Sequence, residues 1–213
     1  TGVPMRPPPT EDLAPWFLTL DDLDGAVDWS EFYENDHPVE LDVGCGRGLF
    51  LVNSATAHPE TNYCGIEIDY REGRRTARRL KKRTMTNARV LGGDARVALE
   101  KLVKPRSVAA VHVYFPDPWW KRKHRRRRIF NDEFLELVAG ILVHGGELHS
   151  WSDVGEYFQT IRDLVDHHAD FHEEPLPDLK DPEHDMDYLT SYDRKGRRAG
   201  SEIHRGRWRC TAG

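Results

Sequence analysis

Hydrophobic residues recur along the chain as short apolar runs that alternate with longer amphipathic stretches. The short runs are typical of strands buried on both faces, and spacings of three and four residues in the longer stretches indicate helices. The predicted strands are Val39–Val43, Asn62–Ile68, Ala88–Leu91, Val108–Phe115 and Glu147–Trp151. The predicted helices are Leu49–His58, Tyr70–Arg83, Ala95–Val103, one around Phe134–Leu142 and one around Val154–Val165. This alternation predicts an α/β fold in which a mostly parallel sheet has helices on both faces.

The second half of the pattern contains its own boundary signals. Asn131 or Asp132 is the candidate N-cap of the helix around Phe134–Leu142, and Gly145-Gly146 is the expected stop after it. The short alternation from Ile203 to Cys210 predicts an edge strand near the end of the chain.

The segments outside these predicted strands and helices indicate where the folded domain begins and where a long loop lies. Residues 1–30 include the proline run Pro7–Pro9 and are predicted to form a partly disordered tail, followed by a single domain over residues 31–213. Because the chain begins at Thr1 and not at Met, we expect it to be processed or trimmed. The segment Pro175–Tyr188 is rich in Pro and Asp, and its length favours a functional loop over a simple connection.

Composition narrows the class of protein. The chain has 213 residues, 38% hydrophobic and 31% charged, which is enough apolar material for a folded core. Its three cysteines, Cys45, Cys64 and Cys210, form no C-x-x-C pair, and the histidines are scattered. We therefore expect no disulfide framework and no metal site. No run approaches the ~20 apolar residues that span a bilayer, so we expect a cytoplasmic protein without membrane contact.

The net charge of -5 conceals two concentrated basic segments. Arg71–Arg83 holds eight basic residues and one acid, and Lys121–Arg128 holds seven basic residues and His124. A protein that is acidic overall but locally this basic favours a local site for a polyanion such as nucleic acid. Two interpretations of Arg71–Arg83 are equally good: an auxiliary contact with RNA, and a helix face that is simply exposed to solvent.

A glycine-rich turn follows the first predicted strand. The sequence Leu41-Asp42-Val43-Gly44-Cys45-Gly46-Arg47-Gly48 lets a nucleotide-like ligand approach the backbone closely. Its G-x-G-x-G spacing differs from the G-x-G-x-x-G of dinucleotide sites, where a helix N-terminus receives a pyrophosphate. The spacing therefore favours a ligand without a pyrophosphate and disfavours a nicotinamide dehydrogenase.

Carboxylates lie at the ends of three successive predicted strands. Glu67 is placed to accept both ribose hydroxyls, and Asp94 to accept from the amino group of adenine while Ala95 donates its backbone N–H. Asp42 is placed to receive the cationic amino group of a methionine moiety. This combination resembles the class I methyltransferase fold, which implies a Rossmann-like, mostly parallel seven-stranded sheet with an antiparallel C-terminal strand. It also implies S-adenosylmethionine as cofactor and S-adenosylhomocysteine as product.

The segment after the fourth predicted strand makes the resemblance specific. Residues Asp117 to Arg128 read D-P-W-W-K-R-K-H-R-R-R-R, which resembles the D-P-W-x-K-x-R-H-x-K-R-R signature of the tRNA (guanine-N7-)-methyltransferases. Ser152-Asp153 resembles the family's T-D, and Thr190–Asp193 its T-x-[FY]-E. The resemblance extends from about Val39 to Cys210.

The chain departs from the family pattern at five positions. Asp42 and Asp193 replace a usual Glu, Lys123 replaces Arg, Ser152 replaces Thr, and Trp120 stands where Pro is common. All but Trp120 keep the hydrogen-bonding type.

The resemblance implies methyl transfer to N7 of a guanine in tRNA, in the variable loop. It implies Asp117 as the catalytic residue, held rigidly by the prolines on either side. Trp119 or Trp120 offers a stacking surface for a base, although Trp119 also fits a core position. The expected cofactor-binding residues are Asp42, Gly44, Gly46, Glu67, Asp94, Ala95 and Asp117, and the expected substrate-binding residues are Lys121, His124, Arg127, Asp153, Thr190, Tyr192 and Asp193.

Two alternatives stay open on the residues alone. One is a methyltransferase for another RNA or for a small molecule, and the other is a non-catalytic RNA-binding module. The chain is expected to act as a monomer or a homodimer with tRNA as its partner.

Overall fold

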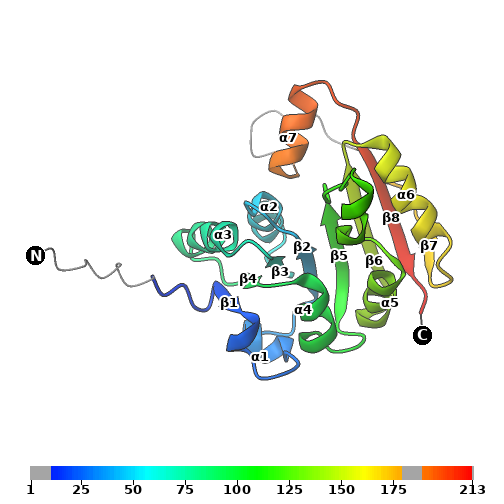
Figure 1. The fold of residues 1–213 in the computed structure, drawn as a ribbon. Coiled ribbons are helices and arrows are strands. Elements are labelled where there is room, and N and C mark those ends of the chain that lie inside the picture. The colour runs from blue at the N-terminus through cyan, green and yellow to red at the C-terminus, as the bar shows by residue number, and fades with distance from the viewer. Residues whose placement is uncertain (1–10, 179–188, 213) are drawn as a thin grey trace, which may run out of the picture.

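The computed structural model describes residues 11–178 and 189–212, which form one mixed sheet with helices on both of its faces (Figure 1). The strand order is β1-β4-β3-β2-β5-β6-β8-β7. The strands are β1 (Phe17–Thr19), β2 (Val39–Val43), β3 (Asn62–Glu67), β4 (Ala88–Gly92), β5 (Val108–Tyr114), β6 (Leu142–Ser152), β7 (Phe171–Glu173) and β8 (His204–Cys210). From β1 to β6 the neighbours pair in parallel, and β8 is antiparallel to both β6 and β7.

Helices cover the sheet as the alternation of strands and helices predicts. They are α1 (Trp29–Tyr33), α2 (Leu49–Ala57), α3 (Tyr70–Lys82), α4 (Ala95–Leu102), α5 (Asp132–Ile141), α6 (Gly155–Asp166) and α7 (Ser191–Arg198), with 3-10 turns η1 (Leu20–Asp22) and η2 (Arg122–Arg127). One buried cluster joins the sheet to α2 and α3, and another joins it to α1, α4, α5 and α6. Neighbouring strand residues such as Tyr63 and Cys64 belong to different clusters because successive side chains point to opposite faces.

The structure confirms the fold class and corrects its details. Its described part has eight strands where seven were expected. The sequence did not reveal β1 or β7, because each has only three residues and too short a pattern to detect.

The predicted strand near the C-terminus is confirmed as β8, but its predicted edge position is wrong, because β8 lies between β6 and β7 and buries Trp208 completely. The helix stop at Gly145-Gly146 is also wrong. Helix α5 ends at Ile141, and both glycines lie within β6, where the ladder to β5 is irregular. The N-cap of α5 is Asn131, whose side chain accepts from Phe134 N.

Residues 11–30, assigned to a tail on the sequence alone, pack against the sheet. Leu13 and Phe17 are buried, and β1 pairs with β4 from Phe17↔Val90 to Thr19↔Gly92. Trp29 begins α1 and donates through its indole N–H to Ser107 Oγ at 3.1 Å. Residues 1–10 lie outside the described residues. The predicted loop Pro175–Tyr188 is described only over residues 175–178, and its remaining residues, 179–188, lie outside the described residues.

Candidate functional site

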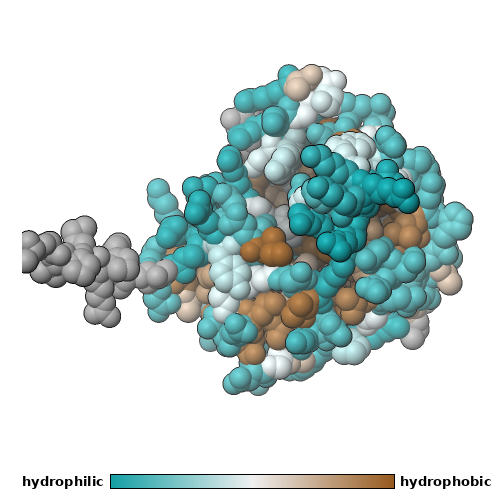
Figure 2. All heavy atoms as spheres, viewed as in Figure 1, coloured by the Kyte–Doolittle hydropathy of each residue, from teal (hydrophilic) through white to brown (hydrophobic). Residues whose placement is uncertain are grey.

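A cleft of ≈ 1510 Å³ opens at the carboxyl ends of β2, β3, β4 and β5. Because parallel strands end at the same sheet edge, the residues that follow them meet there. The glycine turn, Glu67, Asp94 and the segment around Asp117 all line this cleft, and so do residues of α7. In the space-filling view, strongly hydrophilic side chains gather beside the recessed centre of the molecule, in the region of η2 (Figure 2).

The glycine turn adopts a backbone that other residues rarely form. Gly44, Gly46 and Gly48 have φ values of 77°, 50° and 67°. A Cβ at Gly48 would lie 2.1 Å from Thr76 Cγ2 of α3, and the Thr76 hydroxyl donates to Gly46 O at 2.8 Å. Helix α3 therefore packs directly on the turn and fixes its shape.

Glu67 is fixed at the end of β3 by the backbone of two turns. Its Oε2 accepts from Gly46 N at 2.8 Å, and its Oε1 accepts from Asp69 N at 2.9 Å. A carboxylate has about four lone-pair directions, so each oxygen can still accept from a ligand hydroxyl. The geometry fits the expected contact with a ribose.

Asp42 is a buried carboxyl group that has no counter-charge among the described residues. Only 3% of the residue is exposed, and none of the described residues donates a hydrogen bond to its carboxylate. Burial, together with the nearby charge of Glu67, raises the pKa of Asp42 to about 8. A cationic ligand group would supply the missing partner, which fits the amino group of S-adenosylmethionine.

Asp94 closes the cofactor side of the cleft as the N-cap of α4. One oxygen, Oδ1, accepts from Arg96 N at 2.8 Å and from Val97 N at 3.4 Å. The other oxygen has no hydrogen bond to the described residues. Asp94 and Ala95 both line the cleft, which fits the expected contact with an adenine.

The segment that contains Asp117 is strained on both sides. Phe115 and Trp119 have φ values of 52° and 41°, which side chains larger than Gly rarely adopt. Phe115 N donates to Trp151 O at 2.8 Å, and its ring stacks on Tyr192 of α7 at 6.0 Å. Asp117 itself is exposed and lines the same cleft as Asp42, Glu67 and Asp94.

The predicted substrate residues separate into two groups. Arg127, Thr190 and Tyr192 line the cleft. The Arg127 guanidinium lies 5.1 Å above the Trp119 ring, and half-buried Trp119 lines the cleft, while Trp120 is 54% exposed. An aromatic ring and a cation therefore line the same cleft as Asp117.

The second group lies outside the cleft lining. Lys121 directly precedes η2, His124 lies on η2, and Asp153 is exposed next to α7. Asp193 is 1% exposed and is occupied within the protein, since it accepts from Arg197 Nε at 2.7 Å and from Leu189 N at 2.8 Å. Its carboxylate holds α7 in place beside the cleft.

Sequence reasoning missed the basic side of α7 and two further residues of the cleft lining. Arg194, Lys195 and Arg198 of α7 line the cleft. The available signal was the amphipathic basic stretch after Thr190–Asp193, which is only eight residues long as a helix. Arg96 and Tyr114 also line the cleft and were not anticipated.

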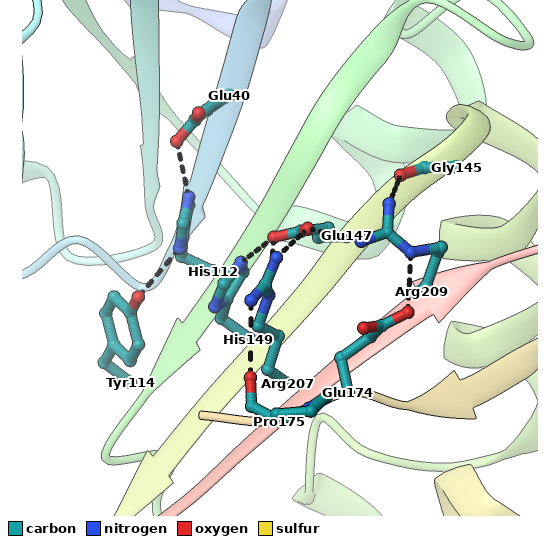
Figure 3. A network of polar contacts seen from close by, with 10 residues as sticks. All are labelled: Glu40, His112, Tyr114, Gly145, Glu147, His149, Glu174, Pro175, Arg207 and Arg209. Atoms are coloured by element: carbon teal, nitrogen blue, oxygen red, sulfur yellow. Dashed lines mark hydrogen bonds and ion pairs between the residues drawn. The ribbon is translucent and has the colours of Figure 1, made fainter. Parts of the chain in front are cut away.

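A chain of polar contacts links the neighbouring strands β2 and β5 (Figure 3). Glu40 Oε2 lies 2.7 Å from His112 Nε2, and His112 Nδ1 lies 2.8 Å from the Tyr114 hydroxyl. Because Nε2 donates to the carboxylate, Nδ1 accepts from Tyr114. Burial lowers the pKa of His112, which favours this neutral ring, and the ring stacks on His149 at 4.8 Å. The chain fixes Tyr114 at the floor of the cleft.

Fold and site together define a class I methyltransferase, with a glycine turn and carboxylates at successive strand ends. The family profile described as "Putative methyltransferase" matches residues 36–206. A tRNA (guanine-N(7)-)-methyltransferase of Rhodopirellula baltica is 37% identical over 206 residues, covering 94% of this chain and 76% of that protein. One of Geobacter metallireducens is 31% identical over 202 residues, covering 95% and 96%. The chain belongs to the tRNA (guanine-N7-)-methyltransferase family.

Solved structures agree on the fold. The antibiotic-resistance methyltransferase Kmr superposes with a TM-score of 0.55 at 18% identity, covering 86% of this chain and 92% of that one. Within residues 11–178 and 189–212, no helix is long and apolar enough to cross a membrane. The same residues contain no group of three His, Cys, Asp or Glu side chains placed to hold a metal ion.

Proposed function

We propose that this protein transfers the methyl group of S-adenosylmethionine to N7 of a guanine in the variable loop of tRNA. One observation carries the proposal: the cleft that contains Asp42, Glu67 and Asp94 also contains Asp117 and Arg127. Donor carboxylates and a basic, base-stacking rim thus meet in one place. The named activity of the relatives from Rhodopirellula baltica and Geobacter metallireducens supports the same reaction.

The cofactor, when bound, supplies a methyl group on a positively charged sulfur. The protein's own residues hold the two reactants. Glu67 binds the ribose hydroxyls, Asp94 and Ala95 bind the adenine edge, and Asp42 binds the amino group. Each role needs an acceptor or donor at the cleft surface, which the described geometry supplies.

Guanine N7 carries a lone pair and loses no proton when it is methylated, so a strong general base is not needed. The reaction needs N7, the methyl carbon and the sulfur in line, and much of the acceleration comes from this alignment. In our proposal, Asp117 accepts from guanine N1–H and from its N2 amino group, which aims N7 at the methyl group. Trp119 stacks on the base after it leaves its neighbours in the RNA.

The remaining predicted substrate residues act around this centre. Arg127, Lys121 and His124 of the basic segment bind RNA phosphates, and Asp153, Thr190 and Tyr192 contact the RNA at the α7 side. For Asp193 we propose an indirect role, because its buried carboxylate is already paired with Arg197. We place the reaction in the cytoplasm.

The test is incubation with a radiolabelled methyl donor and unmodified tRNA, followed by mapping of 7-methylguanine. Wild-type protein should label one variable-loop guanine. Asp117→Ala should lose transfer by 100-fold or more, while its binding of S-adenosylhomocysteine stays measurable. Label at another nucleotide would reject the named specificity, and wild-type turnover by Asp117→Ala would reject the role of that residue. A small-molecule methyltransferase would instead show little loss of substrate affinity as salt rises.

A further inference from the structure

The segment around Asp117 is held by the last residue of the basic segment, Arg128. Arg128 Nε donates to Pro118 O at 2.7 Å, one residue after Asp117. The guanidinium carbon lies 4.5 Å above the ring of Tyr157, a residue of α6 that is 1% exposed. One end of the Arg128 side chain therefore rests on the core, and its N–H restrains a turn whose flanking residues have unfavourable φ values.

Arg128 differs in its surroundings from the rest of the basic segment. Residues 121–123 and 125–127 are exposed, whereas Arg128 is half-buried. Among the described residues, Arg128 is the one member of the segment whose side chain donates a hydrogen bond to the turn over residues 115–119. Its position suits contact with the protein better than contact with RNA.

The backbone of Arg128 is also tied to the cofactor side of the cleft. Arg96 Nη2 donates to Arg128 O at 2.7 Å. Arg96 lies in the first turn of α4, directly after Asp94 and Ala95. A continuous set of contacts thus runs from the expected adenine edge, through Arg128, to the carbonyl beside Asp117.

We propose that Arg128 is a positioning residue that keeps Asp117 aimed at the substrate base, and that it does not bind RNA phosphate. This inference rests on the proposed function and adds a residue that acts through Asp117. The planar guanidinium is required, because it must stack on Tyr157 while Nε–H points at Pro118 O. Lysine keeps the charge but offers neither the flat face nor a donor at that point of the side chain.

Two substitutions separate geometry from charge. Arg128→Ala and Arg128→Lys should both lower kcat by about 100-fold, the scale expected when a reacting group is misplaced by about 1 Å. In both variants, KM for tRNA and the dissociation constant for S-adenosylhomocysteine should stay within about threefold of wild type. The slope of log affinity for tRNA against log salt should not change.

Arg125→Ala is the matched comparison, since Arg125 lies in the same segment and is exposed. The Arg125→Ala variant should have a higher KM for tRNA. The slope of its log affinity for tRNA against log salt should be smaller by about one, as for a lost phosphate contact. If Arg128→Lys restores wild-type kcat, or if Arg128→Ala behaves as Arg125→Ala does, Arg128 is an RNA contact and the proposal is wrong.

Hydrogen exchange tests the restraint without any substrate. Arg128→Ala should speed amide exchange by at least tenfold in peptides that cover residues 115–120, while peptides from β2 and β3 exchange as in wild type. Unchanged exchange in residues 115–120 would overturn the proposal. Global acceleration would overturn it too, by showing a general folding role. If wild-type protein fails to methylate tRNA but the local exchange effect appears, the proposed function fails and the restraint stands.

Discussion

The buried carboxyl group of Asp42 makes cofactor affinity depend on pH. In the ligand-free protein, burial and the charge of Glu67 raise the pKa of Asp42 to about 8, so the group is mostly protonated at pH 7. An ion pair with the ligand's amino group requires the carboxylate. Binding below pH 8 must therefore release a proton, and each pH unit below that value costs about 1.4 kcal/mol.

The size of the effect follows from this single titration. When the pH is lowered from 8 to 6, the dissociation constant for S-adenosylhomocysteine should rise by roughly 50-fold. Above pH 8 it should approach a constant value, because Asp42 is then mostly ionised before the ligand binds. Calorimetry in two buffers of different ionisation enthalpy should show close to one proton released per ligand at pH 6.5. The substitution Asp42→Asn should abolish both the pH dependence and the proton release, and leave a uniformly weak affinity.

The ionisation of Asp42 also affects the stability of the ligand-free protein, which falls as the pH rises, whereas ligand affinity increases. The pKa of an Asp side chain is about 3.8 in the unfolded chain, and the pKa of the folded, ligand-free group is about 8. Because the folded state then binds more protons, the ligand-free protein loses stability as the pH rises through this interval, by at most about 6 kcal/mol. Asp42→Asn should therefore melt at a higher temperature than wild type at pH 8, although it binds ligand less well. A wild-type dissociation constant that does not change between pH 6 and pH 8, or a slope that persists in Asp42→Asn, would refute this reasoning.

Two further substitutions test the cofactor side of the cleft. Glu67→Ala should weaken S-adenosylhomocysteine binding by more than tenfold in calorimetry, since it removes the proposed ribose acceptor, and an unchanged dissociation constant would reject that role. Gly48→Ala should lower the free energy of unfolding by about 1–3 kcal/mol, because the residue has a φ of 67° and its Cβ would lie 2.1 Å from Thr76 Cγ2. Gly140→Ala is its control, because a Cβ there meets nothing within 4 Å, and denaturant unfolding that shows equal effects for both would contradict the packing argument.

The sequence predicted those parts of the fold in which hydrophobic residues recur with a clear period. Strands β2 to β5 and helices α2 to α4 lie within two residues of their predicted bounds, because each is an apolar run or an amphipathic stretch closed by Gly, Asp or polar residues. The order of these elements was sufficient to place Asp42, Glu67, Asp94 and Asp117 at one sheet edge.

The rest depended on tertiary contacts that a local pattern does not contain. Strand β8 is interior only because the three-residue β7 pairs beyond it. Asp193 stands at the acidic position of a family motif, but a local pattern does not show that its carboxylate pairs with Arg197 inside α7. Arg128 is one of eight consecutive cationic or histidine residues in the sequence, and its contacts with Pro118 and Tyr157 distinguish it.

The burial of all three cysteines has a consequence for redox chemistry. Burial raises the thiol pKa of Cys64 to about 12 and that of Cys45 well above its usual range, so both lack the thiolate that oxidants and alkylating reagents attack. Cys45 belongs to the glycine turn and lines the cleft, although only 8% of the residue is exposed. Slow modification by a thiol reagent is therefore expected at this position, and a nucleoside bound at the glycine turn should slow it further.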